Sequence, residues 1–148
     1  MIRKMTTMDL SNALHLIIQT AVVKNRRLRF IDLIKTERGL HKFVAQLDHF
    51  EHYIKTQGAM IFDKPQAMET FIRENLSLED CACVLSTQKE YKQGKMTTVR
   101  HLLQDLVGAG NGTLAFSGKN PLFCFYLGED VSVNYAWRIE NTECQKVE

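Results

Sequence analysis

Residues 113–139 read TLAFSGKNPLFCFYLGEDVSVNYAWRI, and this stretch carries the strongest strand signal in the sequence. Aromatic and β-branched residues dominate three short segments within it, residues 113–116, 122–127 and 131–139, and this composition is typical of β-strands. Gly118 separates the first two segments, as glycines do at turns. The stretch therefore predicts an antiparallel meander of three strands.

A helix and a further strand are predicted just before this meander. Thr97 is a suitable cap for a helix over residues 97–107, whose leucines and valines recur at helical spacing and which Gly108 would end. Residues 81–86, CACVLS, form a short apolar run without helical period. Such a run is typical of a buried strand.

The amino-terminal half predicts helices. Apolar side chains recur every three or four residues over residues 9–23, 28–35 and 37–55, with Thr36 as a cap for the third helix. Pro65 suits the first turn of a fourth helix that runs to Asn75. The order, helices and then β-α-β-β-β, predicts an α+β fold in which a helical amino-terminal half packs on a mostly antiparallel carboxy-terminal sheet.

The length of 148 residues predicts one domain spanning the whole chain. With 45% hydrophobic and 24% charged residues, the composition is that of an ordinary globular protein. A subdivision into a helical part, residues 1–58, and an α+β part, residues 64–140, is the alternative, because residues 56–64 are the best candidate boundary.

Several short motifs resemble a group of small bacterial proteins of uncharacterised function. They are LDHF at 47–50, CVLS at 83–86, LVG at 106–108, GNGTL at 110–114 and FYLGE at 125–129. The resemblance spans roughly residues 26–139. It differs at residues 91–94, YKQG, where the group favours an aspartate-glycine turn. Because the shared positions are core apolar residues and turn glycines, the resemblance implies fold boundaries and no catalytic residues.

The charge distribution is polarised although the formal net charge is only +2. Residues 24–42 have a local net charge of +5, whereas residues 129–148, which include Glu143, Lys146 and Glu148, have a net charge of −3. Arg26, Arg27 and Arg29 form the densest basic cluster. A solvated helix junction is the first interpretation of these arginines. As a partner-binding cluster, we expect them to bind an acidic protein surface rather than nucleic acid, because the net charge is low and no base-stacking motif accompanies them.

We expect a cytoplasmic protein with reduced thiols and no membrane segment. The apolar run at residues 14–23 is interrupted by His15, Gln19 and Thr20, and lacks the cleavage site of a signal peptide. No stretch approaches the roughly 18 apolar residues of a membrane span. Free thiols among the four cysteines are usual in the cytoplasm.

The sequence DHFEH at residues 48–52 invites a metal site. Asp48 and His52 lie one helical turn apart, with His49 as a third candidate ligand. Helix geometry, however, rotates His49 away from them and puts His41 about 10 Å along the axis from Asp48. We therefore expect a solvated polar face and no bound metal.

The cysteines allow a similar hypothesis. In a strand, Cys81 and Cys83 point to the same face, where a third thiol such as Cys124 could join them. His101 is the nearest basic partner in sequence for a nucleophilic thiol such as Cys83. Because a fourth ligand is missing and the neighbours are apolar, we expect the thiols to pack in the core. No cofactor is predicted.

The aromatic residues of the meander predict a contact surface. Strand alternation sends Phe123 and Phe125 to one side and Tyr126 to the other, while Tyr135 and Trp137 share a face. We expect the second side of this sheet or its last edge strand, with Tyr126 and Trp137, to bind a partner or a second copy of the chain. Burial of all these rings in the core is the alternative.

These observations favour a protein-interaction or regulatory module without catalytic activity. The alternatives are a small hydrolase or transferase whose site comes from distant segments, for instance His101 with Cys83 or Glu90, and nucleic-acid binding through residues 24–42.

Overall fold

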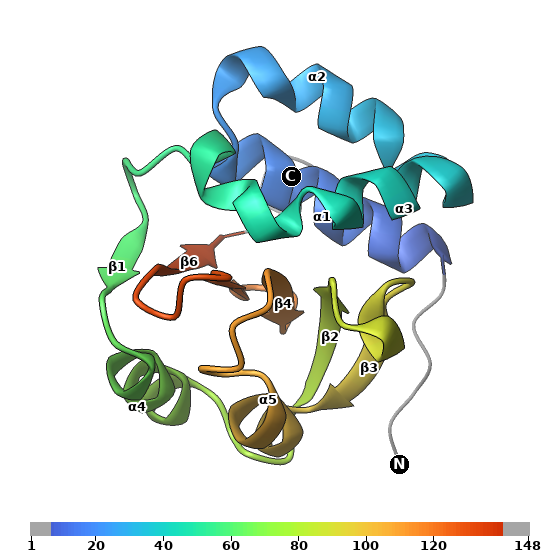
Figure 1. The fold of residues 1–148 in the computed structure, drawn as a ribbon. Helices are drawn as coiled ribbons and strands as arrows, with labels where there is room; N and C mark the ends of the chain where they lie inside the picture. The colour runs from blue at the N-terminus through green and yellow to red at the C-terminus, as the bar shows by residue number, and fades with distance from the viewer. Residues whose placement is uncertain (1–6, 141–148) are drawn as a thin grey trace, which may run out of the picture.

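The computed structural model describes residues 7–140, with side chains from residue 10 onward, and arranges them in three layers (Figure 1). The amino-terminal layer consists of α1 (Thr7–Ala21), α2 (Lys24–Leu33), α3 (Glu37–Ala45) and the 3-10 helix η1 (Leu47–Tyr53). The middle layer is a sheet of six strands, β1 (Met60–Phe62), β2 (Cys81–Ser86), β3 (Lys95–Thr98), β4 (Thr113–Ser117), β5 (Leu122–Leu127) and β6 (Asn134–Ile139). The third layer is α4 (Pro65–Asn75) and α5 (Val99–Asp105), and η2 (Lys89–Tyr91) is a single turn before β3.

The sheet confirms the α+β prediction. Its strand order is β1-β6-β5-β4-β2-β3, and every neighbouring pair is antiparallel. Strands β4, β5 and β6 form the predicted meander, with Leu114 opposite Tyr126 and Tyr126 opposite Tyr135. The helices that precede the sheet in sequence pack on one of its faces.

The amino-terminal helices cover the face that carries alternate residues of the central strands, among them Leu85, Leu114, Cys124, Tyr126 and Trp137. Side chains such as Leu14, Ile17, Phe43 and Phe50 meet these residues in one apolar cluster. This cluster joins residues of the 1–58 part to strands of the 64–140 part. The apolar residues that recur at helical spacing in the sequence are therefore the residues that pack on the sheet.

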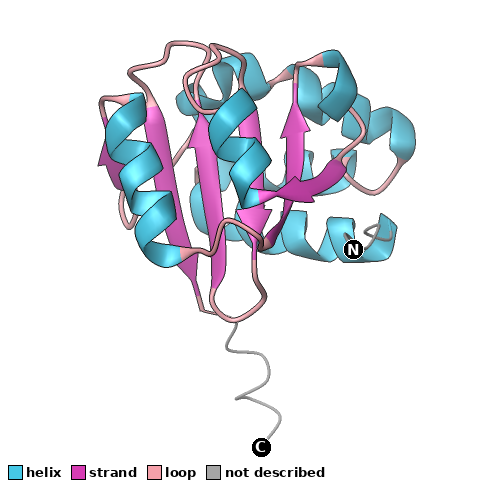
Figure 2. Ribbon diagram, turned by 90° about the horizontal axis from the view of Figure 1, so that it is seen from below, coloured by secondary structure: helices cyan, strands magenta, loops and turns pink. Residues whose placement is uncertain are grey.

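Helices α4 and α5 cover the opposite face of the sheet (Figure 2). Met68 and Ile72 of α4 and Leu102 of α5 pack against Val84 and Phe125, which are fully buried. The expectation that the second side of the sheet is open to a partner is therefore wrong. Burial on both faces also explains why the strands read as nearly continuous apolar runs.

The edges of the sheet differ from the prediction. The last strand, β6, is paired on both sides, with β1 and with β5. The edge strands are β1 and β3, and neither was predicted. Strand β1 has three residues and β3 has the polar sequence KMTT, so neither carries a local strand signal. They adopt strand conformation because β1 pairs with β6 and β3 pairs with β2, and their own composition does not favour it.

Three predicted boundaries also shift. Helix α3 ends at Ala45, and the predicted continuation is the 3-10 helix η1, in which His49 has non-helical backbone angles. Thr98 caps α5 through its side chain, which accepts from the His101 N–H, whereas Thr97 pairs with Ala82 in the sheet. Strand β6 begins at Asn134, because residues 130–133 form a turn.

Two predicted helix starts are confirmed. The Thr36 hydroxyl accepts a hydrogen bond of 3.0 Å from the Gly39 N–H at the start of α3, and Pro65 occupies the first turn of α4. Within the described residues, no helix has the length and apolar character needed to cross a membrane.

Candidate functional site

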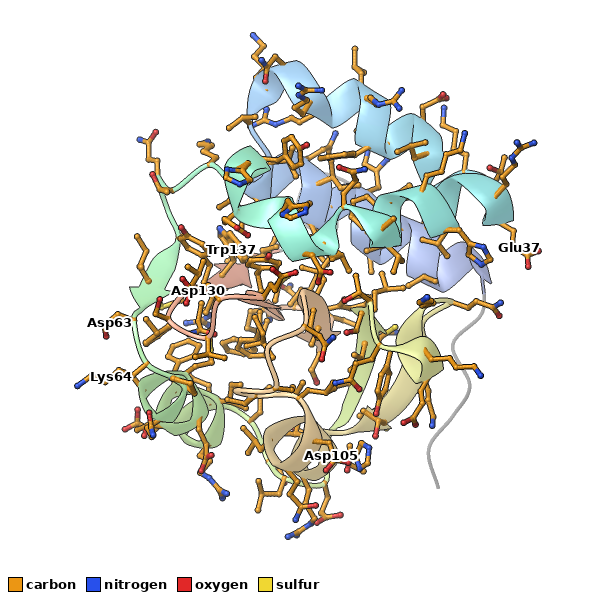
Figure 3. All side chains as sticks on the ribbon, viewed as in Figure 1. Glu37, Asp63, Lys64, Asp105, Asp130 and Trp137 are labelled. Atoms are coloured by element: carbon orange, nitrogen blue, oxygen red, sulfur yellow. The ribbon has the colours of Figure 1, made fainter. Side chains whose placement is uncertain are left out.

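Tyr126 and Trp137, predicted as partner contacts, lie in the core. Their exposed fractions are 0% and 2%, and Figure 3 shows Trp137 in the interior beneath the amino-terminal helices. The Tyr126 hydroxyl lies 2.5 Å from the Leu47 carbonyl oxygen and 2.8 Å from Glu51 Oε2. Burial, and then the hydrogen bond to Glu51, raise the pKa of Tyr126. The prediction of contact rings is wrong for these two residues, because helices cover the face that carries them.

Asp48 joins segments that are distant in sequence. Its Oδ1 accepts two hydrogen bonds, one of 2.8 Å from the Thr87 hydroxyl and one of 2.7 Å from the Gly112 N–H. Gly112 is buried against η1, where a Cβ atom would lie 2.2 Å from the Leu47 carbonyl carbon. The Leu47 carbonyl oxygen also accepts a hydrogen bond from the Tyr126 hydroxyl. Because these tertiary hydrogen bonds engage Leu47 and Asp48, the chain leaves the α-helical path after Ala45. We name this cluster, Leu47, Asp48, Thr87 and Gly112, the Asp48 junction.

The histidines near Asp48 do not join it in a metal site. His41, His49 and His52 are exposed, and the ring centroids of His49 and His52 are 6.3 Å apart. Within residues 10–140, no group of three or more His, Cys, Asp or Glu side chains could hold a metal ion. Asp48 instead accepts the hydrogen bonds of the junction.

The three described cysteines are free and do not converge. Cys81 is exposed at the start of β2, whereas Cys83 and Cys124 are buried beneath the amino-terminal helices on either side of Phe116. Burial raises the pKa of Cys83 to about 12 and also raises the pKa of Cys124. Cys144 lies outside the described residues. Packing, rather than thiolate chemistry, is the role that suits the two buried thiols.

These environments predict selective thiol labelling. At pH 8 in the folded protein, we expect iodoacetamide to modify Cys81 much faster than Cys83 or Cys124, because only thiolates react and the two buried thiols are shielded and protonated. Peptide mapping by mass spectrometry measures the three rates. In urea all three should react at similar rates, and rapid labelling of Cys83 in the folded protein would contradict its burial.

His101 has partners other than a cysteine. Its Nε2 lies 3.0 Å from the Tyr91 hydroxyl and 2.9 Å from Asp105 Oδ2. Helix α5 packs on the face opposite to the one that carries Cys83, and Figure 3 shows Asp105 on that outer layer. The hypothetical pair of His101 with Cys83 is therefore not formed. The cluster instead anchors Tyr91, the last residue of η2, whose side chain is 1% exposed.

The predicted basic cluster divides in two. Arg27 is half-buried, and its Nε donates a 2.8 Å hydrogen bond to the Val22 carbonyl oxygen beyond the end of α1. Arg26 and Arg29 are exposed and line a hollow of about 360 Å³ together with Lys42 of α3. We name this the arginine hollow.

A larger hollow of about 840 Å³ lies between α3 and the segment that runs from Thr87 through η2 to β3. Lys89, Lys92 and Lys95 line it, together with His41 and Glu90. We name it the lysine hollow. Ala45 lines both this hollow and the arginine hollow, so the two adjoin at the end of α3.

A third hollow, of about 320 Å³, lies between α1 and α3 and shares His41 and Gln93 with the lysine hollow. We call the three hollows together the basic surface. In the described part of the chain, seven cationic side chains and two acidic ones line it: Arg26, Arg29, Lys35, Lys42, Lys89, Lys92, Lys95, Glu37 and Glu90. Among the described residues, Lys35 pairs with Asp32 and Lys95 with Glu90, and the other five cations make no ion pair.

Sequence reasoning found the arginines of this surface and missed the lysines of residues 89–95. These lysines recur at a spacing of three, but they lie in a polar segment whose sequence predicts a loop. Their position opposite α3 depends on the sheet and on the Asp48 junction, whose Thr87 lines the lysine hollow. The acidic residues Glu143 and Glu148 lie outside the described residues, as does Lys146.

No protein-family model, curated protein or solved structure matches this chain.

Proposed function

We propose that this protein is a protein-interaction module without catalytic activity, and that its basic surface binds an acidic segment of a partner protein. The observation that carries the proposal is the excess of unpaired cations at adjoining hollows of α2, α3, η2 and β3. Complementary charge steers such encounters and selects against basic partners.

The shape of the surface also supports a protein segment as ligand. Apolar side chains such as Leu10, Leu40 and Val44 line the hollows beside the cations. A chain that alternates carboxylates with apolar groups would use both kinds of contact, whereas a nucleic-acid backbone would use the cations alone. Free Cys83 and Cys124 suit a reducing compartment, and the proposal includes a cytoplasmic location.

Charge reversal tests the proposal. We expect Lys89→Glu with Lys92→Glu to weaken the binding of a short aspartate-rich peptide about tenfold or more, because two favourable pairings become repulsions. The matched control is Lys64→Glu with Lys119→Glu, two exposed lysines that line none of the three hollows and that should leave affinity unchanged. Titration calorimetry measures both variants.

Nucleic acid is the competing ligand, and its salt dependence identifies it. A short single-stranded oligonucleotide of the same net charge is titrated between about 50 and 200 mM salt, where each phosphate neutralised adds about 0.7 to the slope of log affinity against log salt. The proposal would be overturned if the oligonucleotide bound more tightly than the peptide and if Lys89→Glu with Lys92→Glu abolished that binding. Equal effects of the control and test variants would also overturn it.

A further inference from the structure

The arginine hollow has a composition unlike that of the other two hollows. It lies between α2, the end of α3 and η1, and among the residues that the structure describes no acidic side chain lines it. Its lining residues are Arg26, Arg29, Phe30, Leu33, Lys42, Ala45, Gln46 and Tyr53. The lysine hollow contains Glu90, and the hollow beside α1 contains Glu37. An anion in the arginine hollow would therefore meet only cations and neutral groups.

Two guanidinium groups from one helix reach this hollow. Arg26 and Arg29 are three residues apart on α2, which places them on one side of the helix. Lys42 approaches from α3. Among the described residues, none of the three cations has an ion pair or a side-chain hydrogen bond. Their donors are therefore available to a ligand.

One guanidinium is held in place by a ring. Arg26 Cζ lies 5.4 Å from the centroid of the Tyr53 ring, within the range of a cation–π contact. The Tyr53 ring itself packs edge-on against Phe30, which is 3% exposed. This contact restrains a long side chain before any ligand arrives, which lowers the entropy cost of binding.

Gln46 adds neutral donors to the hollow. Its Oε1 lies 3.4 Å from the Tyr53 hydroxyl, which donates to it. Within the described part of the chain, no residue accepts from the Gln46 side-chain N–H groups. Two guanidinium forks, one ammonium and one amide thus line a single concave space of about 360 Å³.

We propose that the arginine hollow binds the phosphate group of a phosphorylated side chain in the partner's acidic segment. A phosphomonoester carries a charge of about −1.5 to −2 near pH 7 and three acceptor oxygens, whereas a carboxylate carries one charge and two oxygens. Paired guanidinium forks suit the phosphate, because each can donate two parallel hydrogen bonds. This inference rests on the proposed function and specifies one ligand of the same surface.

The volume and the aromatic content of the hollow favour one phosphorylated side chain over a nucleic-acid strand. Sites for small ligands run from about 300 to 1,000 Å³, so the hollow is near the lower limit. Tyr53, the ring beside the cations, already contacts Arg26 and Phe30. Binding of single strands requires open ring faces for successive bases.

The experiment compares three short acidic peptides that differ at one central position, which is phosphoserine, serine or glutamate. Affinities for the intact protein are measured by titration calorimetry. We expect the phosphoserine peptide to bind about tenfold or more tightly than the serine peptide, with the glutamate peptide close to serine. The variant Arg26→Gln with Arg29→Gln should reduce this preference to less than about twofold, because the forks are lost.

Two control variants separate the forks from general charge. Lys89→Gln with Lys92→Gln removes the same charge from the lysine hollow and should weaken all three peptides while the phosphoserine preference persists. Arg26→Lys with Arg29→Lys keeps the charge and should lose most of the preference. Thermal unfolding verifies that each variant is folded.

Each remaining outcome contradicts the inference. Equal affinity for the phosphoserine and serine peptides overturns it and leaves the proposed function standing, whereas failure of all three peptides to bind overturns both. Inorganic phosphate that binds as tightly as the phosphoserine peptide would mean that the hollow takes free phosphate. Tighter binding of a short oligonucleotide would identify a nucleic-acid ligand.

Discussion

Replacing Gly112 by alanine is expected to lower the free energy of unfolding by about 3 to 5 kcal/mol. The added Cβ would lie 2.2 Å from the carbonyl carbon and oxygen of Leu47 and 2.4 Å from the Asp48 nitrogen. These are backbone atoms, so no side-chain rotation relieves the overlap, and η1 must separate from β4. Separation also breaks the bond from the Gly112 N–H to Asp48. Urea unfolding followed by circular dichroism measures the change.

Gly58→Ala is the matched control for this prediction. Gly58 has a φ of 86°, where alanine is strained, but a Cβ there would meet no atom within 4 Å. We expect a loss of about 1 to 2 kcal/mol from backbone strain alone. If Gly112→Ala costs no more stability than Gly58→Ala, the backbone of Leu47 does not exclude a Cβ atom at residue 112.

Removing the Asp48 carboxylate is expected to cost about 2 to 3 kcal/mol, because Asp48→Ala leaves the buried Gly112 N–H and the Thr87 hydroxyl without their acceptor. Asp48→Asn retains one side-chain oxygen and should cost about 1 kcal/mol or less. Asp63→Ala removes an exposed carboxylate at the periphery of the molecule (Figure 3); it is the control and should be within about 0.5 kcal/mol of the parent protein.

A double-mutant cycle tests whether Asp48 acts through its hydrogen bonds. Thr87→Ala alone removes one donor to Asp48, and in an Asp48→Ala background that bond is already absent. We expect Thr87→Ala to lower the free energy of unfolding less in the Asp48→Ala variant than in the parent protein, with a coupling energy of about 0.5 kcal/mol or more. Strict additivity would show that the Asp48–Thr87 bond contributes no measurable stability.

The Asp48 junction also positions the basic surface. Thr87 lines the lysine hollow, and η1, which begins at the junction, ends with Tyr53 in the arginine hollow. One carboxylate therefore connects η1, whose Tyr53 lines the arginine hollow, to Thr87, which lines the lysine hollow. The histidine neighbours of Asp48 in the sequence suggest a metal ligand, but its Oδ1 accepts the hydrogen bonds of Thr87 and Gly112.

Local sequence was sufficient for the features that local physics controls. The Thr36 hydroxyl caps α3 and Pro65 begins α4, because these groups satisfy or avoid free backbone donors within one turn. The strands Cys81–Ser86 and Leu122–Leu127 were found from apolar runs of strand length. The cluster of cations on α2 was visible because its members are neighbours in the chain.

Which surfaces are covered depends on contacts between segments that are distant in the sequence. The many aromatic residues of β5 and β6 suggested an exposed contact face, but α4 and α5 cover one face and the amino-terminal helices cover the other. The apolar content of a strand predicts that the strand is buried. It does not predict which helices cover it, because that depends on packing between distant segments. Likewise, Lys89 and Arg26 belong to one basic surface although they are distant in the sequence. Sheet pairing fixes β2 to β3, and the Asp48 junction fixes η1 to the segment after β2. These long-range contacts leave no periodic signal in the sequence.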